Sequence, residues 1–120
     1  MLLARLPAYC IAVSVLAGCL SLGSLESQTP QVQREVSGDY FTIAECTKAR
    51  QSAMLPPGSR LDLLHDRARG EATVTWSTDI GAYQAYAFKA GANGHTTLKV
   101  YSTTAVPEDR LLIVQQCSAS

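Results

Sequence analysis

The sequence predicts an α+β fold in which one N-terminal helix packs on an antiparallel meander of about five strands, tied by one disulfide. Three observations favour this class. Apolar side chains at helical spacing precede the break at Pro56-Pro57-Gly58. Short runs that alternate apolar and polar residues follow it, separated by turn-forming sequences. Cys46 and Cys117 stand in the helical segment and at the end of the last run.

Residues 40–50 are predicted to form the helix. Asp39 is a suitable N-cap residue, and basic residues gather near the far end, where the helix dipole favours positive charge. One side of the segment at helical spacing carries Tyr40, Ile43, Cys46 and Thr47. A strand is the alternative, because the segment also divides into two alternating faces and Phe41 lies off the helical stripe.

Alternating patterns predict strands throughout the rest of the chain. The expected strands are 60–66, 71–77, 82–89, 95–102 and 110–116. Their connections contain Arg69-Gly70, Asp79-Ile80-Gly81 and Asn93-Gly94. An Asn-Gly pair between two β-rich runs strongly favours a hairpin. Short connections make consecutive strands antiparallel neighbours, which gives a meander.

The N-terminus holds a short apolar run that ends in a small-residue motif. The run at 8–16 follows Arg5 and is far shorter than the roughly 20 apolar residues that a membrane-spanning helix needs. It ends in Leu16-Ala17-Gly18-Cys19, which resembles the lipobox of bacterial lipoprotein signal peptides. The resemblance implies cleavage before Cys19, a diacylglycerol thioether on its sulfur and a fatty acyl group such as palmitate on its amino group. An ordinary secretory signal is the alternative.

This resemblance divides the chain into three parts. It implies a signal peptide at 1–18, a lipidated cysteine with a flexible tether at 19–36, and a small α+β periplasmic domain at 37–120. The tether is expected because its residues are mostly polar or small and include no aromatic side chain. Leu20 follows the cysteine where an aspartate would imply inner-membrane retention in enterobacterial-type sorting. The expected location is therefore the periplasmic face of the outer membrane, with a stable lipid anchor.

The cysteines predict one disulfide. Cys10 lies in the expected leader and Cys19 takes the lipid, which leaves Cys46 and Cys117. Disulfides persist in an oxidising compartment such as the periplasm. We expect these two cysteines to pair and close a loop of roughly 70 residues. Two reduced thiols are the alternative.

Composition and motif content argue against several functions. The chain has 10 basic and 10 acidic residues without a basic run, so no nucleic acid partner is expected. It has no G-x-S-x-G, C-x-x-C or H-x-x-x-H spacing, so we expect no catalytic residues, metal or cofactor. Asp62 and Asp66 resemble a glycosidase pair only in spacing, because no aromatic sugar platform accompanies them. His65 and His95 are expected to be ordinary strand-end and turn residues.

Strand alternation predicts a candidate partner surface. If Cys117 meets the helix, Leu112 and Val114 point to the opposite face of the sheet. Tyr101 is expected there too, with Tyr86 and Phe88 as further candidates. Apolar residues on an open sheet face indicate a partner surface, and coverage by a loop is the alternative.

Beyond the lipobox, the chain resembles loosely the small lipoproteins of the Gram-negative envelope, which implies no activity. We expect a non-catalytic binding or accessory module with a protein partner in the cell envelope. The alternative is an inhibitor of a cell-wall hydrolase such as host lysozyme. An inhibitor would present a loop around Ser77-Thr78-Asp79 or His65-Asp66-Arg67.

Overall fold

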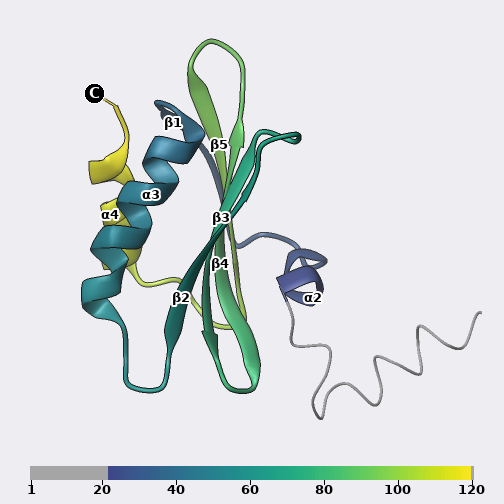
Figure 1. Ribbon diagram of the computed structural model, residues 1–120, viewed down its shortest axis with the longest axis vertical. Helices are drawn as coiled ribbons and strands as arrows, with labels where there is room; N and C mark the ends of the chain where they lie inside the picture. The colour runs from purple at the N-terminus through teal and green to yellow at the C-terminus, as the bar shows by residue number, and fades with distance from the viewer. Residues whose placement is uncertain (1–21, 120) are drawn as a thin grey trace, which may run out of the picture.

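The computed structural model describes residues 22–119 and arranges them in three layers (Figure 1). A five-stranded antiparallel sheet forms the middle layer. Helices α3 (Tyr40–Gln51) and α4 (Glu108–Cys117) cover the face that we call the helix face. The short helix α2 (Leu22–Glu26) lies on the other, which we call the outer face. The predicted α+β class is confirmed, whereas the expected signal peptide and Cys19 lie outside the described residues.

Four strands form the predicted meander. They are β2 (Arg60–Asp66), β3 (Glu71–Thr78), β4 (Gly81–Ala90) and β5 (His95–Ser102). Each pairs antiparallel with the next. Asn93 and Gly94, between β4 and β5, adopt positive φ angles of 58° and 74°. Asparagine and glycine tolerate this left-handed conformation best, which is why their sequence marks the turn.

The prediction of a strand at 110–116 is wrong, because this segment lies in α4. Pro107 precedes the helix, and Glu108 and Asp109 occupy its first turn, where the helix dipole favours carboxylates. Helical spacing buries Leu111 and Val114 in the core. An apolar run of this length fits a buried strand or one side of a helix equally well.

The fifth strand comes from the expected tether. β1 (Val32–Ser37) pairs with β5, so that Val32 lies opposite Val100 and Ser37 opposite His95. The prediction of a flexible spacer is therefore wrong for α2 and β1, and the folded unit begins before residue 37. The strand order is β1-β5-β4-β3-β2, so β1 and β2 form the two edges of the sheet. Residues 19–21 of the expected tether are outside the described part.

Helix α3 confirms the predicted helix over the alternative strand. The Asp39 carboxylate accepts a hydrogen bond from the Thr42 backbone N–H at 3.0 Å. This bond is the main reason why the pKa of Asp39 is lowered. Lys48 and Arg50 lie in the last turn, as expected. The buried positions are Ile43, Ala44, Thr47 and Gln51, so the buried stripe lies slightly to one side of the predicted one.

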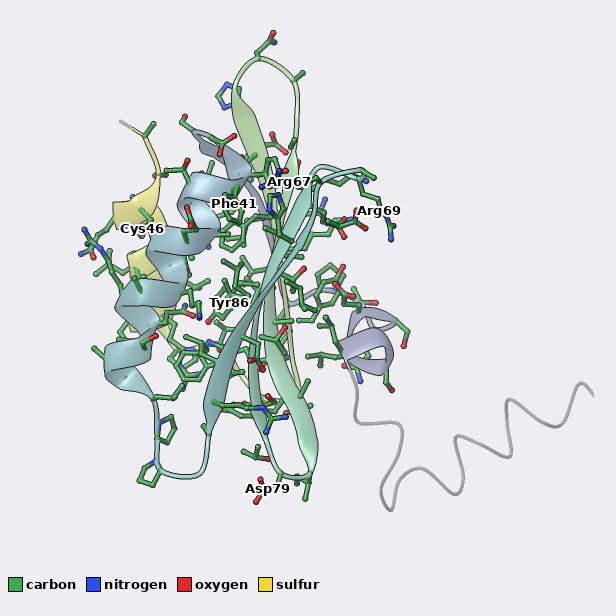
Figure 2. The ribbon with its side chains drawn as sticks, viewed as in Figure 1. Phe41, Cys46, Arg67, Arg69, Asp79 and Tyr86 are labelled. Atoms are coloured by element: carbon green, nitrogen blue, oxygen red, sulfur yellow. A yellow bond between two sulfur atoms is a disulfide. The ribbon has the colours of Figure 1, made fainter. Side chains whose placement is uncertain are left out.

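The core fills the space between the helices and the helix face. Its most deeply buried apolar strand residues, each at most 1% exposed, are Ala72, Val74, Trp76, Tyr86, Phe88, Leu98 and Val100. Tyr86 and Phe88 therefore belong to the core, and their assignment to an open face is wrong. Figure 2 shows Tyr86 between the helices and the sheet. Within the described residues, no helix is long and apolar enough to cross a bilayer.

A set of buried polar groups joins both helices to the sheet. The Trp76 Nε1 donates to Gln51 Oε1 of α3 at 2.8 Å. The Arg110 guanidinium of α4 lies 3.8 Å from the Trp76 ring centroid and donates to Gln84 Oε1 at 2.7 Å. The Tyr86 hydroxyl donates to the same Gln84 oxygen at 2.8 Å, and burial raises the pKa of this phenol. Paired groups of this kind fix a packing geometry that apolar contacts alone leave adjustable.

The predicted disulfide is confirmed. Cys46 of α3 bonds to Cys117 at the end of α4, across a sequence separation of 71. Figure 2 shows Cys46 on the side of α3 next to α4. The bond ties the first long helix to the last element of the chain.

Opening this bond is expected to destabilise the fold. We expect the Cys46→Ala/Cys117→Ala variant to lose about 4 kcal/mol of unfolding free energy, because the unfolded chain regains the freedom of the long loop. Denaturant unfolding measures the loss. The parent protein should lose a similar amount on reduction, whereas the double variant should not respond to reductant. Equal stability of the oxidised and reduced parent would contradict the prediction.

Candidate functional site

The residues expected to form one partner surface do not share a face. Tyr101 lies on β5 opposite Ala85, on the outer face. Leu112 and Val114 lie on α4, in the opposite layer. Val114 is 1% exposed, and Leu112 is 51% exposed. The predicted single surface is therefore wrong, and the cause is the helix that replaces the expected last strand.

Tyr101 instead belongs to a small apolar cluster beneath α2. Leu25 of α2 is buried against Ala82 and Ala85 of β4. Leu22 and Tyr101 pack at the margin of this cluster. The small alanine side chains let the short helix approach the sheet closely. Because α2 has only five residues, it covers part of the outer face and leaves the rest open (Figure 1).

The open part of the outer face contains a hollow of about 570 Å³ beside Tyr101 and α2. Three cations and three carboxylates line this outer-face hollow: Arg69, Lys89, Lys99, Glu26, Glu35 and Glu71. Ala87 lies among them, opposite Lys99 in the sheet. The hollow is therefore polar, balanced in charge, and built mainly on rigid strands.

Strand register explains how these charges come together. Lys89 of β4 lies opposite Glu71 of β3. Glu35 of β1 lies opposite Thr97 of β5, whose hydroxyl donates to Glu35 Oε2 at 2.7 Å. Side chains that alternate with the core residues must point to the outer face, so each strand contributes its polar positions to this surface.

Burial perturbs two ionisable groups at the edge of the hollow. Glu26 is the last residue of α2; its partial burial raises its pKa, and the nearby Glu71 carboxylate raises it further. Burial also raises the pKa of Tyr101, with the Glu26 carboxylate as the next cause. The raised pKa means that docking of α2 on the sheet favours the protonated form of the Glu26 carboxyl. Docking of α2 is thus more favourable at acidic pH and weakens as the pH rises through the raised value.

His65 packs against two aromatic residues of α3. Its ring stacks on Phe41 with centroids 4.0 Å apart, and the Tyr40 hydroxyl lies 2.8 Å from its Nε2. Asp62 and Asp66 are exposed at alternate positions, which point to the other side of β2. Among residues 22–119, no group of three or more histidine, cysteine or acidic side chains is placed to hold a metal ion.

The two segments proposed for an inhibitor loop lie at opposite ends of the sheet. Figure 2 shows Asp79 at one end and Arg67 at the other. Asp79 and Ile80 form the turn between the paired residues Thr78 and Gly81. The Ile80 side chain is 74% exposed, the highest value among the exposed large apolar residues described.

Comparisons with known proteins give no match: no family model, no curated protein and no solved structure resembles the chain. Function must therefore be argued from the chemistry of the surface.

Sequence reasoning found Tyr101 but missed the charged hollow next to it. Alternation within β4 and β5 already places Lys89 and Lys99 away from the core. The sequence pattern does not add Glu35, because it predicts a flexible tether for this segment. The hollow exists only once β1 pairs with β5 and α2 docks beside it.

Proposed function

We propose that this chain is a lipid-anchored protein of the periplasmic face of the outer membrane and acts as a non-catalytic binding or accessory module for an envelope protein. The outer-face hollow is the observation that carries the binding role. It presents both signs of charge and one tyrosine on a rigid sheet. Such surfaces select partners by electrostatic complementarity and by a few aromatic contacts.

The anchor and the hollow lie close together in this proposal. Cys19 of the lipobox precedes Leu22, the first residue of α2, by three positions. Three residues span at most about 11 Å, so a lipid on Cys19 holds α2 near the membrane surface. Because α2 packs on the outer face, the hollow then lies beside the membrane rather than at the end of a long tether. The Cys46–Cys117 bond agrees with an oxidising compartment.

The charge pattern favours a protein as the partner. A polyanion such as nucleic acid would meet Glu26, Glu35 and Glu71 beside the cations. An anionic lipid surface would meet the same repulsion. A protein surface can place an acidic group against each cation and a basic group against each carboxylate.

The anchor is tested first. Cys19→Ala should abolish fatty-acid labelling and membrane fractionation, because the thioether has no sulfur on which to form. Cys10→Ala is the matched control and should leave both unchanged, since this cysteine lies within the apolar run. Labelling of the Cys19→Ala protein at the parent level would contradict the anchor.

The binding surface is tested by charge reversal. A photo-crosslinking residue at Lys99 should capture an envelope protein in cells. Lys89→Glu should reduce this capture roughly tenfold, because it places like charges opposite each other in the complex. Arg50→Glu on α3 is the control and should not affect capture, since Arg50 is exposed in the opposite layer. Equal capture by all three proteins, at equal melting temperatures, would contradict a role of the hollow.

One observation favours the second candidate, an inhibitor of a cell-wall hydrolase such as lysozyme. The β3–β4 turn projects an exposed isoleucine next to Asp79 at the end of the sheet (Figure 2). A protruding apolar residue beside a polar one can enter an enzyme cleft.

This candidate predicts direct inhibition. The purified protein should inhibit lysozyme, and Ile80→Ser should raise the inhibition constant by roughly tenfold or more, as expected for a central contact residue. Leu112→Ser is the control, because Leu112 is a comparably exposed apolar residue in the α4 layer. No inhibition by the parent protein would exclude this candidate and leave the outer-face proposal unaffected.

A further inference from the structure

Strand β2 leaves one edge of the sheet open. Its only strand neighbour among the described residues is β3. A hollow of about 520 Å³ lies against β2 and extends over neighbouring residues of β3 and β4, with Lys48 of α3 and Leu22 of α2 also in its lining. Neither helix layer therefore closes over the edge. The seven residues of β2 include no proline, so the backbone groups on the side away from β3 are available for pairing with another strand.

The side chains of β2 divide between the two faces of the sheet. Leu61 and Leu63 pack against the core on the helix face, and His65 stacks there on Phe41. The alternate positions are exposed on the outer face: Arg60, Asp62, Leu64 and Asp66. Leu64, in the middle of the strand, is 53% exposed.

We propose that β2 pairs with β2 of a second copy of this chain, antiparallel and centred on Leu63, so that one sheet continues through both copies. Arg60 of each copy then lies opposite Asp66 of the other. Leu63 lies opposite its own counterpart, and Leu64 lies diagonal to Leu64 of the second copy. The contact is isologous and closed, as a two-fold axis requires.

Charge complementarity selects this register. A two-fold axis through the sheet places one residue opposite itself, so each register is defined by its central residue. Centring on Asp62 sets two carboxylates opposite each other, and centring on Leu64 sets Asp62 opposite Asp66. Centring on Leu61 pairs Arg60 with Asp62 but uses only three residues of β2. The Leu63 register pairs the whole strand, with opposite charges at both ends and no like charges directly opposite each other. Asp62, like Leu64, lies diagonal to its own counterpart.

The other edge of the sheet does not have this property. β1 also has a free side, since β5 is its only strand neighbour in the described chain. The two registers that use most of β1 are centred on Arg34 and on Glu35. Each sets a charged side chain opposite its own copy, which is destabilising. Self-pairing is therefore favoured at β2 and disfavoured at β1.

This proposal is independent of the proposed function, because the outer-face hollow is lined mainly by other strands. A lipid anchor would favour the pairing by confining both copies to one membrane, but the pairing does not require it.

The test uses two charge-reversed proteins, each in the full, disulfide-bonded chain with Cys19→Ala to exclude lipid-driven association. The parent should form a dimer whose fraction rises with concentration in sedimentation velocity. Arg60→Asp should raise the dissociation constant roughly tenfold, because it sets two pairs of carboxylates opposite each other. Asp66→Arg should do the same through two pairs of guanidinium groups. An equimolar mixture of the two variants should recover the dimer, since each cation again faces a carboxylate.

Recovery of the dimer in the mixture shows that each variant alone fails to dimerise because of its charges and not because it is misfolded. Asp66 also accepts a hydrogen bond from the Arg69 backbone N–H at 3.2 Å, so Asp66→Arg can loosen this turn. A misfolded variant would not recover the dimer, and Asp66→Asn, which keeps an acceptor, should weaken the dimer at an unchanged melting temperature. Arg50→Asp on α3 is the control and should dimerise like the parent. A parent that stays monomeric, or a mixture of folded variants that stays dissociated, would overturn the proposal.

Discussion

The position of α4 depends on one cation held at the edge of the core. Arg110 stacks on Trp76 and donates to Gln84, so it joins the helix to two neighbouring strands. Gln51 accepts from the same indole and thereby connects α3 to this contact. The far end of α4 is fixed separately by the bond to Cys46. With both ends held, the apolar side of α4 covers the helix face, so the open surface of the sheet lies on the outer face and at the edges.

The outer face is controlled by a helix of only five residues. Leu25 holds α2 on the alanines of β4, and the remaining surface is left open and charged. The raised pKa of Glu26 makes the docking of α2 sensitive to pH, with stronger docking under acidic conditions. In the proposed anchored protein, the same contact sets how closely the sheet approaches the membrane. In that proposal, the anchor, α2 and the candidate binding surface form one connected unit.

Local chemistry in the sequence was enough to predict a large part of this structure. Asp39 marked the start of α3, and Asn93-Gly94 marked the β4–β5 connection, because capping and left-handed turns depend on single residues. The lipobox resemblance assigns Cys10 to the leader and Cys19 to the lipid. Cys46 and Cys117 are then the two cysteines left to pair with each other. These features involve either neighbouring residues or the two cysteines that the lipobox resemblance left unassigned.

Tertiary contacts decided what the local pattern left ambiguous. The apolar residues at 111–114 fit a strand or a helix, and packing beside α3 favours the helix. Pro107 and the two acidic residues after it are a local signal for a helix start at this point. Gln33, Arg34 and Glu35 carry no strand pattern of their own, and β1 forms because β5 offers it an edge. The sequence correctly predicts Tyr101 on the outer face, but it does not place Leu112 and Val114 correctly. A surface is composed of residues that only the folded chain brings together.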